Sequence, residues 1–86
     1  MVYFILTRSG YEQLCASGVP AGAALWLSAG VLSAEELLHL RSSGIDVTDF
    51  RDRINPMDLD DVGAAVGTIK EHHPRQVVWV EHEHAA

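Results

Sequence analysis

The chain has 86 residues, a single cysteine and a formal net charge of -6, and it is 48% hydrophobic and 21% charged. This composition excludes a disordered chain, and the negative charge argues against nucleic acid and anionic membranes as partners. We expect one domain over residues 1–86, of modest stability because so small a domain buries only roughly 60 to 65% of the surface that its unfolded chain exposes. The lone Cys15 and the absence of a long apolar segment predict a cytoplasmic protein.

The first predicted elements are a strand and a helix. An unbroken apolar run over residues 2–6, rich in β-forming residues, predicts a strand covered on both faces. Ser9 and Glu12 have the spacing of a capping box, so a helix is predicted to begin at Ser9 and to end at Gly18. Its apolar side has three residues at helical spacing, Tyr11, Leu14 and Cys15.

The middle of the chain has the pattern of a βαβ unit. Residues 23–28 are apolar without alternation, which predicts a second strand covered on both faces. Ser33 and Glu36 form another capping box, which predicts a helix over residues 33–43. Residues 45–50 alternate, as expected of a strand covered on one face. Strands joined by a helical crossover lie parallel in a sheet.

The last predicted helix lies within residues 55–74. Asn55 followed by Pro56 is typical of an N-cap and the first helical position. Gly63 and Gly67 are expected to weaken the helix while allowing it to approach the sheet closely. Its apolar stripe contains Leu59, Val62, Val66 and Ile69.

Residues 76–81 predict the last strand, and residues 82–86 a polar C-terminal tail. The order is therefore β-α-β-α-β-α-β, which predicts an α/β domain with a four-stranded, mainly parallel sheet and three helices. Because the third strand alternates, it belongs at an edge, which favours the strand order 3-2-1-4 over the alternative 2-1-3-4. This element order is similar to that of Rossmann-like, flavodoxin-like and receiver-type domains, which have many unrelated functions.

The strand order places a candidate ligand site outside the carboxyl ends of strands 1 and 4. Thr7, Arg8, Ser9 and Gly10 lead from the first strand into a helix N-terminus. Free backbone N–H groups, two hydroxyls and a guanidinium there favour an anion such as phosphate or carboxylate. The alternative is that Ser9 serves only as the N-cap, because the chain lacks a glycine-rich dinucleotide or phosphate loop.

His82 and His84 are candidate ligands for zinc or a similar ion, because they are two residues apart next to the last strand. The alternative is a solvated tail, since terminal residues are usually exposed and no familiar zinc spacing is present. No cofactor is predicted. No catalytic set is recognisable, because Cys15 is expected on an apolar helix face and the G-x-S-x-G motif is absent.

Val78, Trp79 and Val80 are predicted to line an edge strand that has no proline or lysine to prevent pairing with another chain. We expect a homodimer, either with the last strands of two copies joined antiparallel or with Trp79 and Trp26 packed against a partner's helices. The alternative is a monomer whose edge is shielded by the tail or the third helix. The sequence thus favours a non-catalytic protein-interaction module, with another unidentified protein as a further candidate partner. An anion-binding domain and a metal-assisted enzyme are the alternative functions.

Overall fold

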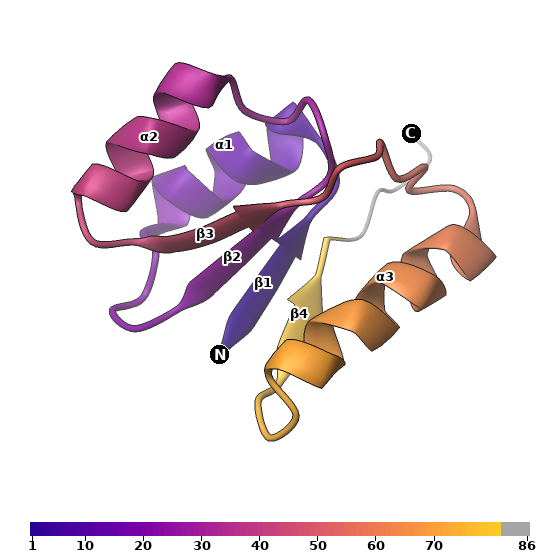
Figure 1. Ribbon diagram of the computed structural model, residues 1–86. Coiled ribbons are helices and arrows are strands. Elements are labelled where there is room, and N and C mark those ends of the chain that lie inside the picture. The colour runs from indigo at the N-terminus through magenta and orange to yellow at the C-terminus, as the bar shows by residue number, and fades with distance from the viewer. Residues whose placement is uncertain (82–86) are drawn as a thin grey trace.

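A computed structural model describes residues 1–81 of the chain and confirms the predicted alternation of strands and helices (Figure 1). The elements are β1 (Val2–Ile5), α1 (Arg8–Ser17), β2 (Ala24–Leu27), α2 (Ala34–Ser42), β3 (Asp46–Asp49), α3 (Leu59–His72) and β4 (Val78–Val80). Each strand after the first follows a helix, so every connection between strands is a helical crossover.

The four strands form one parallel sheet in the order β3-β2-β1-β4, which confirms the preferred topology and not 2-1-3-4. The central strand β1 pairs on both sides, with Val2 opposite Ala24 of β2 and Val78 of β4. The alternating strand β3 lies at one edge, as its half-polar pattern predicts. The short strand β4 forms the other edge.

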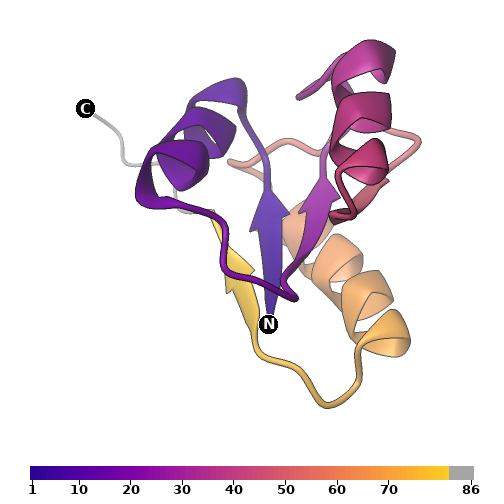
Figure 2. The same ribbon diagram turned by 90° about the vertical axis from the view of Figure 1, so that its left-hand side faces the viewer.

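Helices cover the two faces unequally, with α1 and α2 on one face of the sheet and α3 alone on the other (Figures 1 and 2). Successive strand residues point to opposite faces, so β1 and β2 contribute side chains to two separate cores. Ile5 and Leu25 belong to the core under α1 and α2, whereas Phe4 and Trp26 belong to the core under α3. The domain is therefore doubly wound, with its sheet buried on both sides.

The start of α1 differs from the prediction. The N-cap is Thr7, whose hydroxyl accepts a hydrogen bond from the Gly10 N–H at 3.1 Å, so Ser9 is not the cap and forms no capping box with Glu12. Thr7 is the residue at which the extended backbone turns into the helix, and that position defines the cap. Cys15 is exposed and does not lie on the buried side of α1.

The start of α3 also differs, because its N-cap is Asp58 and not Asn55. The Asp58 carboxylate accepts hydrogen bonds from the N–H groups of Asp60 and Asp61. Asn55 instead closes a turn before the helix, its side-chain oxygen accepting from the Met57 N–H at 2.9 Å. An asparagine side-chain oxygen can stabilise either a helix N-cap or a turn, so the sequence pattern predicted the start of α3 one turn too early.

Two further features of α3 differ from the predictions. Leu59, predicted in the apolar stripe, is the first residue of the helix and is exposed. Gly63 and Gly67 are also exposed, and a β-carbon at either position would have no neighbour within 4 Å. These glycines therefore do not bring α3 closer to the sheet.

Candidate functional site

The carboxyl ends of β1 and β4 meet at a site that the chain fills with its own carboxylate. Glu81, directly after β4, accepts hydrogen bonds from the backbone N–H groups of Leu6 and Thr7, each at 2.9 Å. The Thr7 hydroxyl donates to the same carboxylate at 2.6 Å. Three donors therefore converge on one anionic group next to the N-terminus of α1, where the helix dipole also favours negative charge.

Gly10 provides the room for this carboxylate. A β-carbon at position 10 would overlap the carboxylate of Glu81, so the first turn of α1 and the end of β4 are in direct contact. Gly10 is needed here for its lack of a side chain, since the positive-φ glycines of the chain lie elsewhere.

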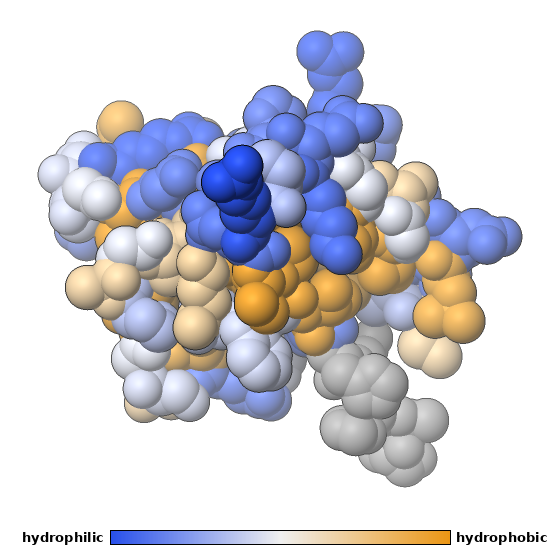
Figure 3. All heavy atoms as spheres, turned by 90° about the horizontal axis from the view of Figure 1, so that it is seen from below, coloured by the Kyte–Doolittle hydropathy of each residue, from blue (hydrophilic) through white to orange (hydrophobic). Residues whose placement is uncertain are grey.

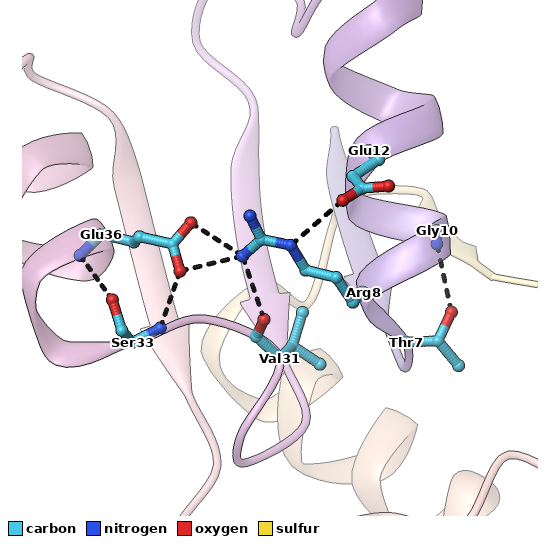
Figure 4. A network of polar contacts seen from close by, with 7 residues as sticks. All are labelled: Thr7, Arg8, Gly10, Glu12, Val31, Ser33 and Glu36. Carbon is cyan, nitrogen blue, oxygen red and sulfur yellow. Dashed lines mark hydrogen bonds and ion pairs between the residues drawn. The ribbon is translucent and has the colours of Figure 1, made fainter.

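Arg8 belongs to a second polar cluster, which joins α1 to α2 (Figure 4). One guanidinium nitrogen of Arg8 contacts both carboxylate oxygens of Glu36, at 2.8 and 2.7 Å. Its Nε donates to Glu12 at 3.4 Å, and the guanidinium lies 5.5 Å from the ring centre of Tyr11. Ser33 and Glu36 complete the predicted capping box of α2, so Glu36 serves the cap and the ion pair together.

The charges of this cluster are mutually stabilised. The Ser33 backbone N–H, followed by the Arg8 guanidinium, holds the pKa of Glu36 below its ordinary value. The hydrogen bond to Glu36 raises the pKa of Arg8. Burial, followed by a hydrogen bond with Cys15, raises the pKa of Tyr11 to about 12. Because the side chains of Arg8 and Glu36 are both partly exposed to solvent, salt is expected to screen their attraction.

The structure brings together only part of the predicted ligand site. Thr7 and Gly10 face the Glu81 carboxylate, whereas the guanidinium of Arg8 is directed toward α2 and the Ser9 residue is exposed. Glu81 begins the segment after strand 4 that the strand order places at this crevice, but its contact with the turn after β1 was not predicted. The available signal was its position, because a carboxylate directly after β4 lies beside the amides that follow β1 when those two strands are neighbours.

The predicted metal ligands His82 and His84 lie outside the residues that the structure describes. Within residues 1–81, no group of three or more histidine, cysteine, aspartate or glutamate side chains is placed to hold a metal ion. His73, near the end of α3, instead accepts a hydrogen bond from the Trp26 indole N–H at 3.2 Å. That imidazole therefore holds the C-terminal end of α3 against the core.

The edge strand β4 presents the predicted interface residues. Trp79 is 55% exposed and Val80 39%, and Val77, which precedes the strand, is 64% exposed. Val78 is half-buried against the core under α3. Trp26 is buried in that same core, so the alternative of packing it against a partner's helices is wrong.

Two surface features adjoin this edge. On the α1 side of β4, a groove of about 260 Å³ is lined by residues that include Tyr3, Leu14 and Trp79. At the amino ends of the strands, apolar side chains gather among hydrophilic ones in the view from below (Figure 3). Met1 and Val77 are the exposed apolar residues that precede the neighbouring strands β1 and β4. Apolar surface thus continues along the edge and around its lower end.

Together these observations define a small doubly wound α/β domain with a polar site filled by its own Glu81 and, within residues 1–81, an edge strand with exposed apolar side chains. No protein-family model matches the sequence, and comparisons with curated proteins and with solved structures gave no significant match. Among the described residues, none of the helices combines the length and the apolar character that crossing a membrane requires.

Proposed function

We propose that this domain is a non-catalytic protein-interaction module that acts as a homodimer through β4. The observation that carries the proposal is the edge position of β4, which pairs with β1 alone among the described strands. An edge strand presents unpaired backbone N–H and C=O groups, and exposed apolar side chains next to them favour pairing with another chain. Trp79 and Val80 are such side chains, and β4 itself has no proline or lysine.

Homodimerisation also supplies buried area that a domain of this size lacks. A chain of this length buries roughly 60 to 65% of the surface exposed on unfolding, so a second copy covering β4 would bury the exposed apolar side chains of Trp79 and Val80. The exposed thiol of Cys15 fits a reducing compartment, and we place the dimer in the cytoplasm on that basis.

Sedimentation equilibrium over micromolar to submillimolar concentrations tests this function. We expect the mass of a dimer for the unaltered protein and of a monomer for Trp79→Lys, because a charge would be buried without a partner at the interface. Leu38→Lys is the matched control, since Leu38 is 65% exposed on α2, and it should leave the dimer intact. A monomer mass for the unaltered protein at the highest concentration contradicts the proposal.

A second candidate function is the binding of a small anion at the turn after β1, and the Glu81 carboxylate favours it. That carboxylate shows that the amides of Leu6 and Thr7 and the Thr7 hydroxyl accommodate an anionic group. A free phosphate or carboxylate would have to displace Glu81, and Arg8 would have to leave Glu36 to reach it.

Amide chemical-shift titration with inorganic phosphate tests this second function. Glu81→Ala removes the internal competitor, so we expect phosphate to shift the amides of Leu6, Thr7 and Gly10 at lower concentration in this variant than in the unaltered protein. Adding Arg8→Ala should weaken the effect. Shifts elsewhere, or none at tens of millimolar phosphate, would exclude anion binding at this turn.

A further inference from the structure

Building on the proposed homodimer, we propose a specific register for it, with the two copies of β4 antiparallel and Trp79 of one copy directly opposite Trp79 of the other. The result is an eight-stranded sheet across the two-fold axis, in which only the central pair is antiparallel. The partner recognised by this edge is therefore a second copy of the same strand.

The backbone of β4 determines which groups are available. The Val2 N–H donates to the Val77 carbonyl at 3.0 Å, and the Glu81 N–H donates to the Phe4 carbonyl at 2.9 Å. Backbone groups of successive strand residues point to opposite sides, so residues 77, 79 and 81 are directed toward β1. Val78 and Val80 therefore direct their N–H and C=O groups outward, which gives the edge two donors and two acceptors.

An antiparallel pair centred on Trp79 satisfies all four groups. Opposing residues in such a pair alternate between those that exchange two hydrogen bonds and those that exchange none. Val78 of one copy then exchanges two hydrogen bonds with Val80 of the other, and the two-fold axis generates a second, identical pair. Trp79 occupies the central non-hydrogen-bonded position, where opposing Cα atoms are about 4.5 Å apart.

Other registers use the edge less well. A pair centred on Val78 requires the N–H of Gln76 as a donor to Val80 of the second copy, but that N–H already donates to the His73 carbonyl at 3.2 Å. A pair centred on Val80 leaves Val78 without a partner within Val78–Val80, because the opposite position would be residue 82. The Trp79-centred register needs only the residues of the strand itself.

Side chains on both faces fit this register. Trp79 is aligned with Tyr3, whose side chain packs on the α1 and α2 face, so two exposed indoles would meet there. Paired aromatic rings at opposing strand positions contribute to sheet stability. On the other face, Val78 packs with the core under α3, and Val80 of the second copy would extend that apolar surface. Val77 would lie opposite Glu81, so no like charges oppose each other.

Disulfide cross-linking tests the register in a Cys15→Ser background, which removes the exposed native thiol. Disulfides form when Cα atoms are about 4.4–6.8 Å apart, so Trp79→Cys should give a covalent dimer at least about tenfold faster than the control Val77→Cys. In this register the two Val77 positions are about 14 Å apart along the strands, although Val77 is more exposed than Trp79. Equal rates, or faster cross-linking of Val77→Cys, would overturn the register.

A measurement on the unaltered chain covers the case in which Trp79→Cys no longer dimerises. In a mixture of isotope-labelled and unlabelled protein, an intermolecular nuclear Overhauser effect between the two Trp79 Hα atoms is expected only when these residues oppose each other. A dimer by sedimentation without this signal would refute the register and leave the homodimer standing. A monomer by sedimentation would refute both.

Discussion

At position 10 the absence of a side chain matters because Glu81 occupies the space. Glycine in a helix usually costs about 1 kcal/mol relative to alanine, so retaining it within α1 needs a structural reason. The contact with the Glu81 carboxylate supplies one, and it couples two residues at opposite ends of the chain.

The effect of Gly10→Ala on the free energy of unfolding should therefore have opposite signs in the presence and in the absence of Glu81. In the unaltered protein we expect it to lower the free energy of unfolding by about 1–2 kcal/mol, because the displaced carboxylate loses its three donors. In a Glu81→Ala background the same change should stabilise by about 1 kcal/mol, through helix propensity alone. Urea unfolding of the four proteins measures both values. A stabilising effect in both backgrounds would show that Glu81 moves aside without cost.

Tyr11 gives a pH-dependent prediction at the same scale. Burial raises the pKa of its phenol to about 12, above the ordinary value of about 10, so the folded state favours the neutral form. The stability that the raised pKa of Tyr11 contributes to the folded state is fully present below about pH 10 and is lost as the pH rises through about 12. Absorbance at the phenolate band in Tyr3→Phe isolates Tyr11. Ionisation near pH 10 while circular dichroism still shows a folded protein would contradict the assignment.

At the scale of the elements, the strand order was predictable because the burial of each strand is visible in its sequence. Apolar runs without alternation correctly identified β1 and β2 as strands covered on both faces, and the polar residues of β3 correctly assigned it to an edge. Each assignment depends only on residues adjacent along the chain.

The helix starts and the candidate site were less accessible because they depend on contacts distant in sequence. Ser9 with Glu12 satisfies the local capping pattern as well as Thr7 does, but Thr7 is positioned by its hydrogen bonds with Glu81, 74 residues away. Arg8 could be recognised as a cation near a helix N-terminus. Its engagement by Glu36 requires the packing of α1 beside α2, which no local pattern reveals.

The exposed glycines of α3 allow this helix to be stabilised. Gly63→Ala and Gly67→Ala should each raise the free energy of unfolding by about 0.5–1 kcal/mol, because a β-carbon meets nothing within 4 Å and alanine restricts the unfolded chain. Gly44→Ala is the matched control and should destabilise, since its φ of 84° disfavours a side chain. Urea unfolding tests all three. Destabilisation by either α3 substitution would indicate an unrecognised contact on this face.

At the scale of the whole molecule, the helices cover the sheet unevenly. Two helices cover one face of the sheet and one helix covers the other, while β4 lies at a margin that no described strand protects (Figure 2). When folding is coupled to dimerisation, stability depends on protein concentration. A higher concentration shifts the equilibrium from unfolded monomers toward the folded dimer by mass action.

For the proposed homodimer we therefore expect the thermal midpoint to rise with protein concentration. Across a hundredfold increase, the midpoint should rise by about 5 °C for the unaltered protein. Trp79→Lys should show no such dependence, whereas Leu38→Lys should retain it. Circular dichroism in cells of different path length covers the range. A midpoint independent of concentration in the unaltered protein would mean that folding does not depend on association.

Because the two tryptophans lie in different environments, their intrinsic fluorescence can report on two different processes. Trp26 lies within the core, against Phe50 and hydrogen-bonded to His73, while Trp79 lies at the margin. A soluble quencher such as acrylamide should reach Trp79 readily in the monomer and Trp26 only after α3 detaches. In Trp26→Phe the emission would follow association, and in Trp79→Phe it would follow unfolding of the core. The two variants thus allow the fluorescence change on dimerisation to be measured separately from the fluorescence change on unfolding.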